Sequence, residues 1–413
     1  MTSMVLPDRS QAMPAALQWT IVTLLVGSGV VSSLQIGKAV VAAPLLQTDF
    51  NVSLTALGWL TGLFAVFGFL GGIPAGAAVS RMGDRRIFLL GLAVIALGSA
   101  LGALAPTFAV LLLARAIEGL GILLIAVAGP AILQRVVDPR RRDVAFGLWS
   151  CFMPIGMALA MLIGPLFVDW HMLWWGGAVL AAVAAYAVFL IVPTRAASTA
   201  PTQSSSWRSL VANTWLTMRS RGPVLMAVCF ALYSLMFLAL FNFLPVLLNQ
   251  RMQVAHGWAG PLSALATGAN IVGNLAAGHL LARGVGRAKL IVFAAATMGI
   301  AGLGVFLPVF PDTVTFLLCV LFAAVGGLIP ATLFSTVPIL APSAVLAPVV
   351  VGLMNSGVNF GQVIGPVLVS GAFEAFGWPG AGAVVAVAAL LAITAAIALG
   401  LTLVAISKRA ATA

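Results

Sequence analysis

Apolar runs long enough to cross a bilayer alternate with short polar segments along almost the whole chain. A membrane-spanning helix needs about 20 mostly apolar residues, because unpaired backbone groups cannot be left in lipid. The pattern therefore predicts an all-α membrane protein with twelve transmembrane helices. The expected spans are residues 17–46, 55–79, 87–105, 108–134, 144–168, 172–193, 222–248, 257–282, 290–310, 313–339, 346–373 and 379–406.

The polar segments between these spans differ in charge on alternate sides. One set is basic, and the opposite set contains a single base, Arg251, among acidic residues. Since basic loops stay in the cytoplasm, both termini are expected there. We expect a multi-pass protein of the bacterial inner membrane. The basic set includes Arg81, Arg85, Arg86, Arg140, Arg141, Arg142, Arg283, Arg287 and Lys289, and the acidic residues are Asp49, Asp169, Asp312 and Glu374.

One long polar loop, residues 194–221, divides the spans six and six. It is rich in Ser and Thr, and we expect one amphipathic helix in it, around Trp207–Met218. The predicted organisation is an N-terminal six-helix half (1–193), a cytoplasmic linker (194–221) and a C-terminal six-helix half (222–413).

The two halves repeat each other. Gly76 after the second span corresponds to Gly278 after the eighth, at an offset of 202 positions. Gly147 in the fifth span corresponds to Gly352 in the eleventh, at an offset of 205. Duplicated six-helix halves are an architecture of transporters, with the substrate site between the halves near the middle of the membrane.

The composition fits this organisation, since 62% of residues are apolar and only 7% are charged. A soluble domain carries roughly 25% charged residues. The net charge of +11 comes from the basic loops, so it indicates topology and contacts with anionic lipid headgroups, not a nucleic-acid partner. The three cysteines lie in apolar stretches, and no cluster of His or Cys has the spacing of a metal site.

Three motifs give the sequence a resemblance to a known family. Gly76-xxx-Ser80-Arg81-x-Gly83-Asp84-Arg85-Arg86 follows the second span, Arg115-Ala-Ile-Glu118-Gly119 lies in the fourth, and Gly352-x8-Gly361-x3-Gly365-Pro366 lies in the eleventh. They resemble the signature loop, the helix 4 motif and the glycine-rich motif of the major facilitator superfamily. The resemblance covers essentially the whole chain. It implies a twelve-helix secondary transporter that works by alternating access and is not an enzyme.

The resemblance also implies a gate at the cytoplasmic ends of the helices. Its residues would be those of the signature loop and of the repeated loop in the second half. The family usually has an Asp where this chain has Ser80, so the resemblance does not extend to the gate contact that this carboxylate makes. The predicted gate residues are Gly76, Ser80, Arg81, Gly83, Asp84, Arg85, Arg86, Arg283 and Arg287.

Lys38, Arg115 and Glu118 are the charged residues well inside the predicted spans. A charge at the bilayer centre costs a few kcal/mol, so it should be paired and face a cavity. Counting about 1.5 Å per residue from the outer ends of the first and fourth spans places all three at similar depth. We expect a charged cluster in the cavity in which Lys38 pairs with Glu118 or with an anionic solute. Glu118 is the candidate carrier of a coupled proton; the alternative is that it only neutralises Arg115.

The second half offers only neutral polar groups inside its spans. Asn242, Asn355 and Asn359 are the candidates for contact with a solute, and hydrogen bonding between helices is the alternative for each.

The sequence thus predicts a secondary active transporter for a small anionic or zwitterionic solute. The alternative is a proton-antiport exporter of amphipathic drugs or metabolites. We expect no cofactor apart from a proton as candidate coupling ion, no metal and a monomeric protein.

Overall fold

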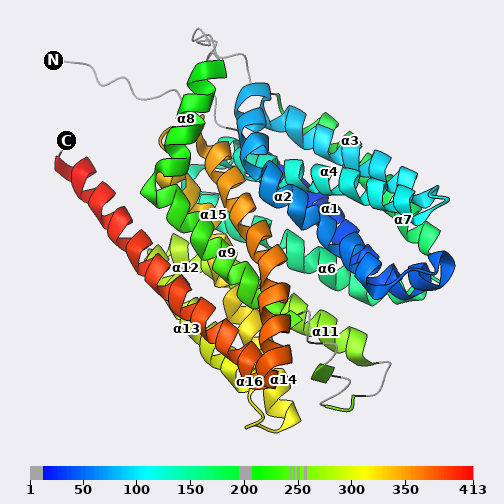
Figure 1. Ribbon diagram of the computed structural model, residues 1–413. Coiled ribbons are helices and arrows are strands. Elements are labelled where there is room, and N and C mark those ends of the chain that lie inside the picture. Colours follow the sequence, from blue (N-terminus) through cyan, green and yellow to red (C-terminus); the bar gives the residue numbers. More distant parts are fainter. Residues whose placement is uncertain are drawn as a thin grey trace, which may run out of the picture.

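Helices make up all the regular secondary structure in the described part of the chain (Figure 1). The computed structural model describes residues 13–194, 207–241, 244, 247–248, 252–254 and 258–412. The first half contains α1 (Ala15–Phe50), α2 (Leu54–Met82), α3 (Asp84–Ala103), α4 (Phe108–Val136), η2 (Pro139–Arg141), α5 (Arg142–Ser150), α6 (Phe152–Ile163), η3 (Gly164–Leu166) and α7 (Trp170–Ile191). The rest contains α8 (Trp207–Arg219), α9 (Arg221–Phe241), α11 (Ala259–Gly268), α12 (Asn270–Ala282), α13 (Arg287–Phe306), α14 (Asp312–Gly326), α15 (Leu328–Leu340) and α16 (Ala347–Thr412).

Ten helices among the described residues are long and apolar enough to cross a membrane, so the chain is a multi-pass membrane protein. The helices differ from the expected spans at several places. The spans expected at 144–168 and 313–339 are each divided, into α5 and α6 and into α14 and α15. The span expected at 257–282 is divided into α11 and α12, and the last two expected spans both lie within α16, which departs from helical geometry at Gly377 (φ 65°). The number twelve stays a prediction.

The helix expected in the central loop is present as α8. The rest of that loop, residues 195–206, lies outside the described residues. Asn242 and Arg251 also lie outside them.

One end of the helix bundle, the basic end, carries the loops 81–86, 135–142 and 283–289. Both described ends of the chain lie there. Near the start of α1, the side-chain oxygen of Gln18 accepts a hydrogen bond of 3.2 Å from the backbone N–H of Asp138. Near the end of α16, a Cβ added to Gly400 would lie 2.8 Å from the Cβ of Ala288 in α13.

Glycines bring helices of the two halves together at the basic end. In α16, a Cβ added to Gly352 would lie 3.3 Å from the Cα of Gly76 in α2. In α5, a Cβ added to Gly147 would lie 3.2 Å from the Cα of Gly278 in α12. Only residues without side chains allow such close approach of two backbones. Towards the opposite end, α2 and α16 diverge (Figure 1).

Candidate functional site

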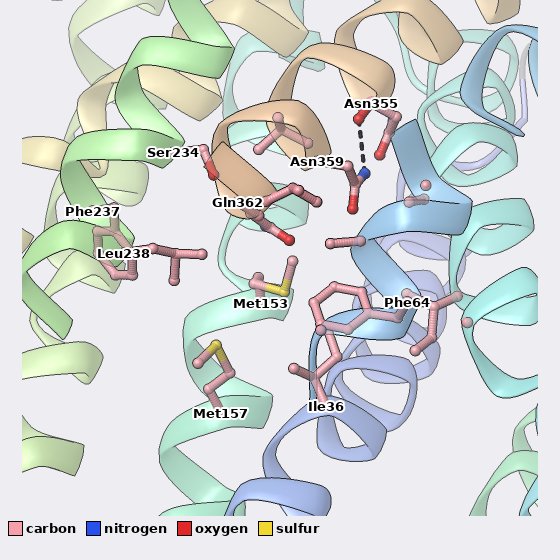
Figure 2. Close-up of a pocket in the computed structure, with 18 of the residues that line it drawn as sticks. Ile36, Phe64, Met153, Met157, Ser234, Phe237, Leu238, Asn355, Asn359 and Gln362 are labelled. Carbon is pink, nitrogen blue, oxygen red and sulfur yellow. Dashed lines mark hydrogen bonds between the residues drawn. The ribbon is translucent and has the colours of Figure 1, made fainter. Parts of the chain in front are cut away.

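A cavity of about 810 Å³ lies between the two halves, beyond the glycine crossings and towards the end opposite the basic end. Residues from α1, α2, α4 and α6 line it on one side, and residues from α9, α15 and α16 on the other (Figure 2). Its walls are mostly apolar and include Phe64, Met153, Met157 and Phe237. None of the described residues that line it is Asp, Glu, Lys, Arg or His.

A few polar groups face this apolar cavity. Asn355 and Asn359 both line it, but their side-chain N–H groups donate to the carbonyls of Val351 and Asn355, four residues earlier on α16, at 3.0 and 2.7 Å. Gln362, one turn further along α16, points between the apolar side chains (Figure 2). Its Oε1 and the Oγ1 of Thr267 on α11 have no hydrogen-bond partner although both atoms are buried. Both residues line the cavity.

The three predicted charged residues come together in one buried cluster. The Nζ of Lys38 lies 2.6 Å from the Oε1 of Glu118, and the guanidinium of Arg115 lies 2.5 Å from the other carboxylate oxygen. Ser99 on α3 donates to Glu118 at 2.5 Å, and the Oε1 of Gln35 accepts from Lys38 at 2.5 Å. Arg115 also donates to the backbone carbonyls of Gln35 and Leu60, at 2.8 and 3.3 Å.

This cluster lies inside the first half and does not line the cavity. Lys38 sits 4.6 Å from the ring centre of Trp174 on α7, and all three charged side chains are at most 5% exposed. On α4 the cavity is lined by Gly119, Ile122, Leu123 and Ala126. Each residue turns a helix by about 100°, so Glu118 points about 100° away from Gly119, whereas Arg115 lies one turn before Gly119 and is held by Gln35, Leu60 and Glu118. The sequence-based expectation placed the cluster in the cavity; in the structure none of its three charged side chains lines the cavity wall.

The predicted gate residues lie at the basic end. Asp84 forms an ion pair with Arg135 at the end of α4, with N–O distances of 2.8 and 3.0 Å. Arg85 donates to the backbone carbonyl of Phe189 at the end of α7, at 2.5 Å. Gly83 joins α2 to α3 with φ of 92°, a conformation that favours glycine. These contacts fasten the loop within the first half. Arg81, Arg86 and Arg283 also lie at this end.

Ser80 makes a contact between the halves. Its hydroxyl donates to the carbonyl of Val345, just before α16, at 2.7 Å, and Gly76 packs against the start of the same helix. A serine donates to this carbonyl, whereas a carboxylate in its place could only accept. The α2–α16 crossing is therefore fastened by a neutral hydrogen bond.

A second contact between the halves involves Asp143, which the sequence analysis did not single out. Its carboxylate, in the first turn of α5, accepts hydrogen bonds from Ser335 on α15 and from Arg287 at the start of α13, the latter at 3.4 Å. Both partners belong to the second half. In the sequence, Asp143 is one acid among several charged residues of loop 138–143, and only the fold identifies its partners.

Comparison with known proteins supports the same architecture. The family model of the Major Facilitator Superfamily matches residues 25–347. In structure, the chain is similar to the human organic anion transporter MFSD10 (18% identity, TM-score 0.76, 94% of this chain and 100% of the other). It is also similar to the proton:xylose symporter XylE (13% identity, TM-score 0.75, 93% and 95%). At these identities the similarity shows the fold alone.

Curated relatives match parts of the chain. The puromycin resistance protein of Streptomyces alboniger is 33% identical over 32% of this chain and 27% of its own length. The multidrug resistance protein Stp of Mycobacterium tuberculosis is 30% identical over 31% of this chain and 24% of its own length, so the match spans about a quarter of the relative's length. A 4-methylmuconolactone transporter of Cupriavidus pinatubonensis, described as probable, is 28% identical over 52% of this chain and 51% of its own length. Because the family model covers most of the sequence and the fold agrees, the chain belongs to the Major Facilitator Superfamily, a family of membrane transporters and not of enzymes.

Proposed function

We propose that this protein is a secondary transporter of small, neutral, amphipathic molecules, which it binds in the cavity between its halves. The observation that carries the proposal is the cavity wall, which is apolar, has no charged side chain among the described residues and presents the unpaired atoms Gln362 Oε1 and Thr267 Oγ1. An anionic solute would need a cation at this wall, because a buried charge without a partner is costly. Lys38, whose charge led the sequence analysis to expect an anionic or zwitterionic solute, already forms an ion pair with Glu118.

Alternating access accounts for the contacts of the basic end. The crossings α2–α16 and α5–α12, with the hydrogen bonds of Ser80 and Asp143, close the cavity on that side. The loop charges support a cytoplasmic location for the basic end and both termini, which makes this the outward-facing state. With it we propose twelve spans in halves 1–193 and 222–413, a monomer, and residence in a bacterial inner membrane with anionic lipids around the basic end. The bacterial relatives support that location.

We also propose that a proton drives transport and that Glu118 carries it. Glu118 is the fully buried carboxylate of the described spans, and its protonation would remove the charge that holds Lys38 and Arg115. Lys38 and Arg115 lie on α1 and α4, which also form part of the cavity wall, so their release could reach the solute site. This is a proton-antiport exporter in the sense of the alternative drawn from the sequence.

Binding to the purified protein tests the solute class. Thermal stabilisation is measured with chloramphenicol as a neutral amphipathic probe, benzoate as an anion and tetraphenylphosphonium as a cation. We expect stabilisation by chloramphenicol alone, and Gln362→Leu should weaken its binding by ~1 kcal/mol, about fivefold in Kd. Stabilisation by benzoate that disappears in Lys38→Met would refute the proposal and support an anionic solute.

Two transport assays in proteoliposomes test the proton. In Glu118→Gln, exchange of solute across the membrane without a proton gradient should persist, while accumulation driven by a gradient should be lost. The double variant Lys38→Met/Glu118→Gln serves as a second probe if the single variant folds poorly. Gradient-driven transport that survives in both variants contradicts a proton carried by Glu118.

A further inference from the structure

The line along which α2 and α16 face each other, which we call a seam, is closed near the basic end and open further from it. Near the basic end, Gly72 and Gly76 of α2 pack directly against the backbone of α16 around Gly352. One turn beyond, Gly68 packs against the side chain of Asn359. At Gly62, two turns further from the basic end, an added Cβ would find no atom of another helix within 4 Å. The two helices are therefore in contact up to Gly68 and separate beyond it.

A pair of aromatic rings marks the level at which this seam opens. Phe69 on α2 and Phe360 on α16 have ring centres 5.3 Å apart, and their exposed fractions are 40% and 41%. Neither ring lines the cavity. In a membrane protein, large apolar side chains exposed at mid-span face lipid, so this pair bridges the two helices on the outer surface of the bundle.

The same helix faces continue from this lipid-facing pair into the cavity wall. On α2, Val66 and Gly62 lie three and seven residues from Phe69; on α16, Val363 and Val367 lie three and seven residues from Phe360. Residues at such spacings share one face of a helix. All four line the cavity, yet Val363 and Val367 are also 38% and 69% exposed. We call these four residues the lateral slot.

The opposite seam, between α6 and α11, has no comparable gap among its described residues. A Cβ added to Gly268 of α11 would lie 3.9 Å from the Cβ of Ala158 in α6, an ordinary packing contact. Both seams border the same cavity, since Met157 on α6 and Thr267 on α11 also line it. The opening is thus specific to one side of the molecule.

We propose that the lateral slot is the path by which a neutral amphipathic solute passes between the lipid and the cavity. The slot has three valines and a glycine, and such walls admit an apolar molecule that a charged lining would exclude. A solute of this class partitions into the bilayer, so its concentration beside the slot exceeds that in water. The route rests on the proposed function, because an ionic solute would not reach the slot from lipid.

The first test does not depend on any solute. The native cysteines Cys151, Cys229 and Cys319 are buried, so cysteines introduced by Gly62→Cys or Met157→Cys can be labelled selectively with a bimane fluorophore. In proteoliposomes we expect aqueous iodide to quench both labels, and lipids with a nitroxide on the acyl chain to quench the label at 62 but not the label at 157. Absence of lipid quenching at 62, or equal lipid quenching at the two positions, would overturn the slot.

The second test follows transport of chloramphenicol through two matched variants. Val367→Trp narrows the slot, while Val40→Trp places the same bulk at another exposed valine of the cavity wall, on α1. The initial rate should fall more in Val367→Trp than in Val40→Trp. Equal rates in the two variants would mean that the solute enters from water and would refute the route. If the unmodified protein does not bind chloramphenicol, the proposed solute class fails, and lipid quenching alone then decides whether the slot is open.

Discussion

The buried charged cluster predicts that its two cations differ in their importance for stability. Lys38 and Arg115 share one carboxylate, so the cluster carries one net positive charge when all three groups are ionised. In Glu118→Gln both cations lose their counter-charge. Removing one partner of a buried pair costs about 3–5 kcal/mol, and Glu118 is fully buried, so we expect a loss in that range.

Lys38→Met should cost much less. It leaves the Arg115–Glu118 pair intact and neutral, and Ser99 still donates its hydroxyl hydrogen to Glu118. We expect a loss of about 1 kcal/mol, the net value of a buried hydrogen bond. In the Glu118→Gln background, Lys38→Met should instead stabilise the protein, because it removes one of two uncompensated cations.

Equilibrium unfolding in mixed micelles of a mild detergent and SDS, followed by tryptophan fluorescence, measures all four proteins of this cycle. The order expected is wild type, Lys38→Met, the double variant and then Glu118→Gln as the least stable. The reasoning is refuted if Lys38→Met destabilises the protein as much as Glu118→Gln does, or if the double variant is less stable than Glu118→Gln.

Three further predictions concern the helix ends and crossings. Asp143→Ala removes the acceptor of Arg287 and should favour opening of the basic end by about 1 kcal/mol, roughly fivefold in population. Opening is measured as the rate at which maleimide labels a cysteine placed at the buried Ala277, and this rate should rise. Asp138→Ala, at the same end, should leave the labelling rate unchanged. Gly352→Val should disrupt the α2–α16 crossing and make the same cysteine label faster. Gly371→Val on the same helix, where an added Cβ meets no atom within 4 Å, should leave the labelling rate unchanged. Equal effects of the two variants would contradict the packing argument. Hydrogen bonds from the ring and backbone N–H of His171 hold the pKa of Asp169 below its usual value, so Asp169 stabilises the fold above its unfolded pKa of about 3.9, and this stability is lost as pH falls through the lower folded value. The thermal unfolding temperature should therefore fall more between neutral and acidic pH in wild type than in Asp169→Asn. Parallel pH profiles of the two proteins would count against this role.

The sequence was sufficient for features that depend on position along a helix axis. Span length, loop charge and the repeated glycines follow from one-dimensional patterns, and the family membership they suggested is confirmed. Depth also follows from counting residues, and Lys38 and Glu118, estimated to lie at similar depth, are in contact at 2.6 Å.

Direction around the axis could not be obtained in the same way. On α4, Glu118 and Gly119 are neighbours in sequence, yet one belongs to the charged cluster and the other to the cavity wall. On α1, Ile36 lines the cavity while Lys38, two residues on, faces α4. A step of about 100° per residue separates these faces, and both contain apolar neighbours, so hydropathy does not distinguish them. The partners of Asp143 were missed for a different reason, since they lie 144 and 192 positions away.

The glycine crossings have a consequence for the origin of the protein. Gly76 and Gly278 occupy equivalent places in the two repeats, as do Gly147 and Gly352, and each contact joins one member of the first pair to one member of the second. Two identical copies of a single six-helix ancestor, related by a twofold axis, would form both crossings with one pair of glycines. Each substitution in such an ancestor would have acted twice. In a single chain the two seams can change independently, and here one seam is fastened through Ser80 and the other through Asp143.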